Sequence, residues 1–510
     1  MSSNFTCFII TRKGIGIIER LSHSNWFYFI LSFVMMDIAY SSLTNMVPWV
    51  DEVMFTDTPI HYVKGMGWTT HAWYSVAHQD PFLLYPPLYS MVMVLWMNIF
   101  GTTLIACRSL NLVVMLLIGC GLLRICRQMG IRMSLVHVSL LIVLLWRTDD
   151  MINMYSNGRP DLLGAAILVF IVGEMIHHRP IPIILLSALL FASGIQTVVY
   201  LFILLLLTLL LLNDYREEIK TLSVLSALGT LLGFLLVCAF MGYHDHLTAF
   251  VVNALSYSTS LMKLAMVTLP VLGDYLGFDT ALYVEKIAGN TTDVPFYSRI
   301  LEIYTHSAYV SLVGVAIFAF FSVHRKQEGS PVYSTMIFLF AVVLSIPLLM
   351  NLAGRFPTYY YWMAYLPLFL LVIILTGLTK GRRYHCIIGL FVLFLVIQGC
   401  VGSNRRQNYS EIERFMDRCT MLRNKSVVAP FSVFYEMERL SSDTYYLGVY
   451  PSRYLPHDIH YMILPQRDSD YGANRLYDYY DSINKSDSLQ TVMVAESKAV
   501  GLKVFKILRR

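Results

Sequence analysis

The sequence predicts a polytopic α-helical membrane protein of about eleven transmembrane helices, with interfacial helices in its outer loops and a small soluble α/β domain at its C-terminus. Of the 510 residues, 56% are hydrophobic and only 14% are charged, and the mean hydropathy is +0.58. Soluble domains usually contain about 25% charged residues. Apolar runs of about 20 residues, the length that crosses a hydrocarbon core, recur until about residue 402.

The apolar runs and the charges between them define the expected spans. These are 26–46, 103–123, 133–147, 160–176, 182–196, 197–212, 221–242, 305–323, 332–350, 362–378 and 385–402. The segment 82–100 is also apolar enough to span, and its placement decides the sidedness of everything that follows.

Basic residues favour an interfacial helix for 82–100. If this segment lies along the outer surface, every later basic cluster falls on the cytoplasmic side, as the positive-inside rule requires. If it spans, the series splits between the two faces. The clusters are Arg124/Arg127/Arg132, His177-His178-Arg179, Arg216–Lys220, His324-Arg325-Lys326 and Lys380-Arg382-Arg383.

This topology predicts two domains, a transmembrane domain of residues 1–402 and a non-cytoplasmic soluble domain of residues 403–510. The tail is charged and rich in tyrosine. In it SEIERFMDRC predicts a helix, and SVVAPF, TVMVAES and VGLKVFKIL predict strands.

Several classes of function are excluded. No P-loop, GxGxxG, HExxH or GxSxG motif stands in a suitable context. The net charge of +5 is dispersed in short clusters, which orients a membrane protein and does not predict nucleic-acid binding. The eight cysteines contain no CxxC pair, so neither a disulfide framework nor a zinc site is predicted. The first span lacks a cleavage site and is expected to be a retained anchor.

The first candidate functional cluster is the acidic pair Asp51-Glu52, directly after Pro48-Trp49-Val50 at the outer end of span one. A carboxylate there can reach a substrate held at the membrane interface. The alternative is two solvated loop acids.

Two further clusters open on the same face under this topology. Asp149-Asp150 precedes Arg159-Pro160-Asp161, which also fits a simple helix start, because Pro suits the first turn and an acid suits the positive end. Arg355 and Tyr359 stand in a run of aromatics before residue 362. Such tyrosines are usually an interfacial belt, whereas an arginine among aromatics suits a phosphate.

Other polar residues leave both interpretations open. Asp37 is an acid within span one, where ionisable groups are functional candidates or bond a neighbouring helix. Arg108 can snorkel or pair with an acid. Histidines 61, 71 and 78 have no spacing that requires a metal and are expected to be ordinary loop residues.

In order and spacing these positions resemble the GT-C superfamily of membrane glycosyltransferases, in the branch of aminoarabinose transferases and protein O-mannosyltransferases. The acidic pair is followed by an aromatic loop and Tyr85-Pro86-Pro87-Leu88-Tyr89, then by Phe100-Gly101 and Arg108, and finally by Arg159-Pro160-Asp161. The resemblance covers residues 25–400 in layout and about twenty residues in specific motifs.

The resemblance implies an inverting transfer of a sugar, a hexose or pentose, from a polyprenyl-phosphate donor at the non-cytoplasmic face. Asp51 matches the family's catalytic acid of the first loop and is the residue expected to act as the base, with Glu52 orienting or assisting it. Asp161 matches the second acid, which would hold acceptor, donor or a divalent cation.

The remaining site residues follow from the charge that develops on the leaving phosphate. Arg355 is the leading candidate to bind it, with Arg159 second and Tyr359 beside them. Tyr85 and Arg108 are expected to bind substrate. No cofactor is firmly required, and the identity of any metal is left open.

Leu84 and Tyr85 stand where aminoarabinose transferases have an acidic and a basic residue before the Pro-Pro pair, which leaves the donor sugar and that subgroup's metal site open. The tail lacks the repeats of eukaryotic protein mannosyltransferases. A lipid-linked glycan or polysaccharide acceptor is therefore favoured over a protein, in a bacterial inner membrane with the site facing the periplasm or outside.

The alternative functions are a transporter or flippase, which would place polar groups at the bilayer midplane, and a non-catalytic scaffold that presents the tail.

Overall fold

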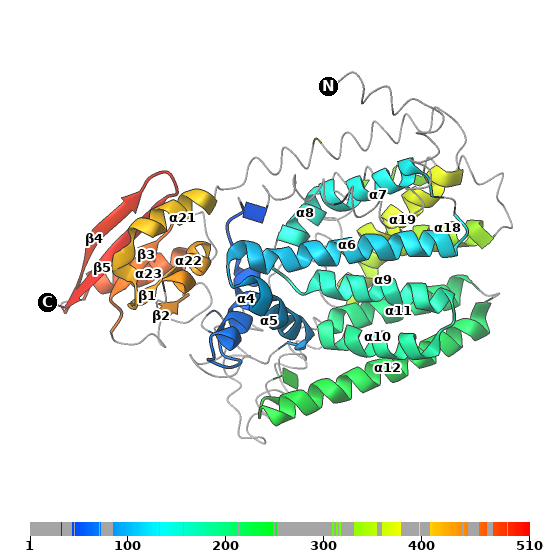
Figure 1. Cartoon of the computed structure of the whole chain (residues 1–510), viewed down its shortest axis with the longest axis horizontal. Coiled ribbons are helices and arrows are strands. Elements are labelled where there is room, and N and C mark those ends of the chain that lie inside the picture. The colour runs from blue at the N-terminus through cyan, green and yellow to red at the C-terminus, as the bar shows by residue number, and fades with distance from the viewer. Residues whose placement is uncertain are drawn as a thin grey trace. The chain divides into compact units, whose positions relative to one another are not determined.

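The structure is a computed structural model of the whole chain (Figure 1). It describes residues 32, 43–44, 46–70, 72, 85–131, 133–156, 158–212, 215–247, 250–251, 309–310, 313–314, 316–317, 331–353, 360–378, 397, 409–440, 443–446, 458–466, 473–486 and 488–509.

The chain divides into two compact units. The helical unit consists of Met1–Ala39, Leu112–Met154 and Pro160–Asn404. The mixed unit consists of Tyr40–Asn111, Tyr155–Arg159 and Arg405–Arg510. The tail after residue 404 therefore belongs to the same unit as Tyr40–Asn111 and the short segment before Pro160.

The described helices before the tail follow the expected spans closely. The helix α5 (Leu88–Phe100) corresponds to the segment expected at the interface, and α19 (Trp362–Leu378) has the predicted bounds. The others are α4 (Val50–Val63), α6 (Leu104–Gln128), α7 (Leu135–Arg147), α8 (Asp149–Ser156), α9 (Asp161–Ile176), α10 (Pro180–Ser193), α11 (Ile195–Leu211), α12 (Arg216–Tyr243) and α18 (Pro331–Ala353). The expected spans 26–46, 305–323 and 385–402 lie largely outside the described residues.

Two of the described helices, α6 and α12, are long and apolar enough to cross a membrane. Their lengths are 25 and 28 residues, against the roughly 20 that a bilayer requires. Along α12 the side chains of Leu228, Leu231 and Leu235 are more than half exposed. An exposed apolar face of this kind is typical of a helix that packs against lipid or against another apolar surface.

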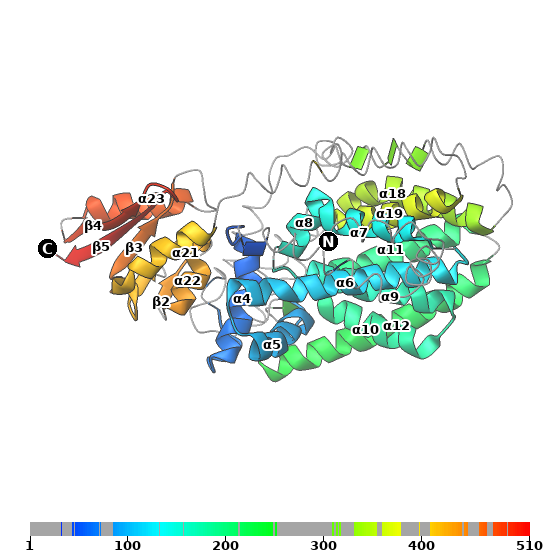
Figure 2. The same ribbon diagram turned by 45° about the horizontal axis from the view of Figure 1, so that its top comes forward.

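The helical unit is built by helices that pack side by side. Figure 2 shows α9, α10, α11 and α12 as neighbours, and α18 packs on α19. The helices α10 and α12 approach each other closely where Gly229 and Gly233 form a GxxxG motif. A Cβ at Gly233 would lie 2.4 Å from the Ala188 carbonyl oxygen, and one at Gly229 would lie 2.3 Å from that of Ile184. Small residues at this spacing let two backbones meet in lipid, where packing replaces the hydrophobic effect as the driving force.

The tail folds into a five-stranded mixed sheet with helices, as the sequence predicts for an α/β module. The strand order is β2-β1-β3-β5-β4; β1 pairs in parallel with β2 and β3, and β5 pairs antiparallel with β3 and β4. The strands are β1 (Ser426–Val428), β2 (Asp443–Tyr445), β3 (Tyr461–Leu464), β4 (Leu489–Ser497) and β5 (Leu502–Arg509). The helices are α21 (Tyr409–Arg418), η3 (Thr420–Leu422), η4 (Phe431–Val433), α22 (Phe434–Arg439) and α23 (Ala473–Asn484).

Both faces of this sheet are buried at β1, at β3 and in the first half of β5, whereas β4 is largely exposed. Val428, Met462 and Phe505 pack against Leu476 and Ile483 of α23. Their strand neighbours Val427, Ile463 and Val504, which point to the opposite face by the alternation of a strand, are also fully buried.

We expect Gly233→Ala to weaken the packing of α10 on α12. The added methyl group meets backbone atoms of Ala188, which cannot rotate away, and overpacking of this kind costs about 1 to 3 kcal/mol. The midpoint of thermal unfolding in detergent should fall accordingly.

The matched control is Gly242→Ala near the end of the same helix, where a Cβ meets nothing within 4 Å. Alanine there should leave the midpoint unchanged or raise it slightly, because alanine is the better helix former. Equal shifts in the two variants would contradict the packing argument.

Candidate active site

Asp51 lies in the first turn of α4, and the sequence around it explains why the helix starts there. Trp49 is the N-cap residue in extended conformation, with φ −99° and ψ 157°, after Pro48. Asp51 and Glu52 follow in the first turn, where a negative charge is favoured by the helix dipole. Because successive residues of a helix project about 100° apart, the two acids face different surroundings.

The Asp51 carboxylate is partly exposed and is held by Arg159. The side chain of Asp51 is 24% exposed, and its Oδ2 accepts a hydrogen bond from Arg159 Nη1. The guanidinium also lies 5.8 Å from the ring centroid of Trp49 and 5.6 Å from that of Phe55. Contact with the two aromatic rings restricts the movement of the Arg159 guanidinium. Arg159 is therefore held by the rings of Trp49 and Phe55 as well as by the Asp51 carboxylate.

Gly158 lets Arg159 approach α4. A Cβ at Gly158 would lie 3.1 Å from Thr56 Cγ2 and 3.2 Å from Glu52 Cγ, tighter than ordinary contacts. The glycine therefore allows the short segment before Pro160 to lie directly on the helix that carries Asp51.

Glu52 faces inward and forms a bidentate ion pair with Arg108. Arg108 Nε donates to Glu52 Oε1 and Nη2 donates to Oε2, both at 2.7 Å, and both side chains are fully buried. Arg108 Nη1 donates to the carbonyl oxygens of Leu43, at 2.5 Å, and Met46, at 2.8 Å. Three nitrogens of Arg108 therefore donate hydrogen bonds within the protein, which agrees with the alternative that it pairs with an acid. Its role as a substrate-binding residue stays a prediction.

The tail completes this buried cluster through Tyr435 of α22. The Tyr435 hydroxyl donates to Glu52 Oε1 at 3.2 Å. Burial, and then the negative charge of Glu52, hold the pKa of Tyr435 well above its usual value. The tyrosine therefore remains a neutral hydrogen-bond donor, and a residue of the tail supports the helix that carries Asp51.

Tyr85, a predicted substrate-binding residue, lies half-buried beside α4. Its ring meets that of Phe55 edge to face, with centroids 5.1 Å apart. It therefore belongs to the same aromatic surroundings as Arg159, through Phe55.

The remaining predicted residues are Asp161, Arg355 and Tyr359. Asp161 is the first residue of α9 and belongs to the helical unit, where its side chain is 9% exposed. Arg355 and Tyr359, like Asp37, lie outside the described residues. Their roles stay predictions.

The structure also brings together residues that the sequence did not single out. His61, expected to be an ordinary loop residue, is fully buried in α4, one turn after the buried Asp57. Glu438 of α22 joins them, and Lys64 Nζ bonds its Oε2 at 2.5 Å. The spacing of Asp57 and His61 by four residues was a signal in the sequence, but Glu438 was not, because only the fold brings it near.

Electrostatics at this second cluster are dominated by its two carboxylates. Burial, and then the charge of Asp57, raise the pKa of Glu438, while Lys64 and His61 oppose this. Burial, and then the charges of Glu438 and Asp57, hold the pKa of the Tyr446 hydroxyl well above its usual value. Negative charge is therefore concentrated in a buried place between α4 and the tail.

No protein-family model matches the chain, and no curated protein matches it. Among solved structures, it is similar across most of its length to GT-C membrane glycosyltransferases, the superfamily that the sequence resembles. ArnT from Cupriavidus metallidurans bound to undecaprenyl phosphate is 12% identical, with 94% of this chain and 97% of that chain covered and a TM-score of 0.45.

Two other solved structures show a similar degree of likeness. The Archaeoglobus fulgidus oligosaccharyltransferase, tethered with an acceptor peptide, is 9% identical over 86% of this chain and 69% of that chain, with a TM-score of 0.49. The arabinofuranosyltransferase AftD from Mycobacteria is 10% identical over 95% of this chain and 40% of its own, with a TM-score of 0.47. At these values the likeness supports no inference about substrate or mechanism.

We expect Arg108→Met to destabilise the protein strongly. The substitution leaves the Glu52 carboxylate buried and without its guanidinium, and removing one partner of a buried pair costs about 3 to 5 kcal/mol. Thermal unfolding in detergent measures the loss.

The matched control on the same helix is Arg124→Met. Arg124 is 34% exposed, and its partner Glu174 retains Arg179 at 3.6 Å, so the loss should stay below about 1 kcal/mol. The double variant Glu52→Gln with Arg108→Met should recover part of the lost stability, because it leaves no buried carboxylate without a partner. A double variant as unstable as Arg108→Met would argue against the ion pair.

Proposed function

We propose that this chain is a membrane glycosyltransferase that moves a sugar from a polyprenyl-phosphate donor to an acceptor hydroxyl, with Asp51 as the general base. The observation that carries the proposal is the difference between two neighbouring acids. Asp51 is partly exposed and is oriented by Arg159, whereas Glu52 is fully buried and forms an ion pair with Arg108. A base must reach the proton that it removes, and Asp51 meets this condition.

The reaction follows from this geometry. Arg159 holds Asp51 Oδ2, which leaves Oδ1 to accept the proton of the acceptor hydroxyl. The acceptor oxygen attacks the anomeric carbon, and the bond from that carbon to the phosphate oxygen breaks. The polyprenyl phosphate leaves with the bonding electrons, and the anomeric configuration is inverted.

The donor class comes from the order of motifs that the sequence shares with the GT-C superfamily. The leaving phosphate gains negative charge in the transition state, so a fixed cation lowers the barrier. We assign this role to Arg355 with Tyr359 beside it, and we assign Arg159 to positioning the base, in view of its bond to Asp51. Asp161 is proposed to hold acceptor, donor or a divalent cation, and Tyr85 to contact the substrate.

Glu52 and Arg108 then act indirectly. Their buried pair, together with Tyr435, fixes the first turn of α4 and so the direction of Asp51. The site is proposed to face the non-cytoplasmic side of a bacterial inner membrane, with a lipid-linked glycan or polysaccharide as acceptor.

Asp51→Asn should abolish transfer while leaving the protein folded. Removing a general base typically costs about 10²- to 10⁴-fold in rate. The measurement is transfer of labelled hexose or pentose from a panel of polyprenyl-phosphate sugars in proteoliposomes.

Asp478→Asn, an exposed carboxylate on α23, is the control and should transfer as the wild type does. Undiminished transfer by Asp51→Asn would refute the assignment of the base. Substrate flux across the vesicle membrane without transfer would favour a transporter instead.

Arg159→Gln tests whether this arginine positions the base or binds the donor. A positioning role predicts a kcat about 10- to 100-fold lower with little change in the KM for the donor, because a misplaced base slows chemistry and leaves binding intact. Steady-state kinetics with varied donor separate the two parameters. A raised donor KM with an unchanged kcat would assign Arg159 to the phosphate.

A further inference from the structure

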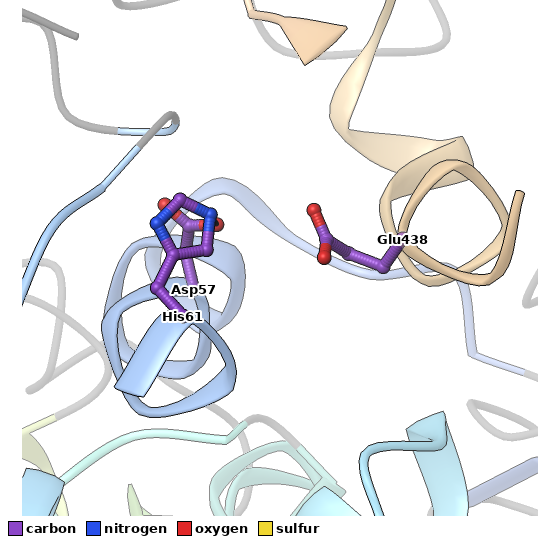
Figure 3. A group of neighbouring side chains, drawn as sticks. All are labelled: Asp57, His61 and Glu438. Atoms are coloured by element: carbon purple, nitrogen blue, oxygen red, sulfur yellow. Dashed lines mark ion pairs between the residues drawn. The ribbon is translucent and has the colours of Figure 1, made fainter. Parts of the chain in front are cut away.

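Asp57, His61 and Glu438 converge between α4 and α22 (Figure 3). Each offers one ligand atom, and these atoms all lie within 4.8 Å of one another. Asp57 and His61 are fully buried, and Glu438 is 9% exposed. Figure 3 shows the carboxylate of Glu438 pointing from its helix toward the other two side chains.

The spacing of the first two atoms suits a metal ion. His61 Nε2 lies 3.4 Å from Asp57 Oδ1. Ligands about 2.0 to 2.2 Å from a tetrahedral zinc ion are about 3.4 Å apart, so these two side chains need little adjustment. Glu438 must close a longer gap, which its flexible side chain allows.

Hydrogen bonds orient both α4 residues in the way that metal ligands are usually oriented. Asp57 Oδ2 accepts bonds from Thr70 Oγ1 at 2.5 Å and from the Ala72 amide at 3.0 Å, which turns Oδ1 toward His61. His61 Nδ1 lies 2.9 Å from Thr69 Oγ1.

One tautomer of His61 is compatible with both bonds of the Thr69 hydroxyl. The single hydroxyl proton of Thr69 is donated to the Met66 carbonyl oxygen at 3.2 Å, so the hydroxyl oxygen accepts from His61 Nδ1–H. In the neutral ring Nε2 then presents a lone pair toward the Asp57 carboxylate. Two electron pairs facing each other in a buried site repel, and a cation placed between them turns the repulsion into two bonds.

Charge balance points the same way. Asp57 and Glu438 together carry two negative charges, of which Lys64 offsets one. The Lys64 side chain is 34% exposed and can turn to solvent, after which the two carboxylates balance a divalent ion. Lys64 donates to Oε2 of Glu438, so Oε1 can coordinate the ion before Lys64 moves away.

We propose that Asp57, His61 and Glu438 form a binding site for a divalent zinc-type ion that joins α4 to the soluble tail. One imidazole nitrogen and two carboxylate oxygens suit zinc, whereas calcium and magnesium prefer oxygen ligands alone. Water would complete four-coordination. The role is structural, and the site stands apart from the sugar-transfer proposal, which neither supports nor requires it.

Metal content of the purified full-length protein tests the proposal. After removal of metals with EDTA, the protein is dialysed with equimolar zinc chloride in the presence of excess magnesium, and bound zinc is counted by mass spectrometry. We expect one zinc per chain in the wild type. Glu438→Gln and His61→Gln should each weaken zinc affinity at least about 10-fold.

Two matched controls separate ligands from neighbours. Glu436→Gln alters a glutamate on the same helix, and His460→Gln alters an exposed histidine. Both should retain one zinc. Wild-type protein without bound zinc, or variants of Glu438 and His61 that bind as tightly as the wild type, would overturn the proposal.

Cobalt substitution in the wild type provides a reading that does not depend on how a variant folds. Four-coordinate Co²⁺ gives an intense visible absorption band. One equivalent of zinc should displace the cobalt ion and abolish this band. A spectrum like that of Co²⁺ in water would overturn the proposal.

Discussion

The buried ion pair of Glu52 and Arg108 is the interaction on which the candidate site depends. A carboxylate with no exposed surface is stable only if its charge is fully compensated, and here two guanidinium nitrogens and a tyrosine hydroxyl do so. These partners come from α6 and from α22, so one charge holds three segments of the mixed unit together. The adjacent residue, Asp51, receives its direction from this arrangement.

Asp51 and Glu52 show how position in a helix gives two chemically similar side chains different surroundings. Glu52 turns into the protein and pairs with Arg108, whereas Asp51 pairs with Arg159 and leaves about a quarter of its side chain exposed. The sequence identified the pair but could not distinguish these surroundings, because both residues stand in the first turn and both satisfy the helix dipole. The difference depends on what packs against each face.

The helices were predictable because hydropathy controls their length and position; α5 and α19 fall on the expected segments 82–100 and 362–378. The end strands of the tail were predictable from their alternation. The elements β2, β3 and α22 were not, since they are short and carry no clear period. Tyr435 and Glu438 belong to such an element, and their partners in α4 lie hundreds of residues earlier, so only the fold could reveal the tail's part in the site.

The long separation between α4 and its tail partners has a consequence for biogenesis. Tyr435 follows Glu52 by 383 residues. At a synthesis rate of about 5 to 20 residues per second, the ribosome needs roughly 20 to 80 seconds to bridge that interval. Arg108 can neutralise Glu52 early, but the segment that carries Asp51 acquires its last hydrogen bonds only when nearly the whole polypeptide has been made. A nascent chain released early would contain α4 and Arg108 and still lack the hydrogen bond from Tyr435 to Glu52.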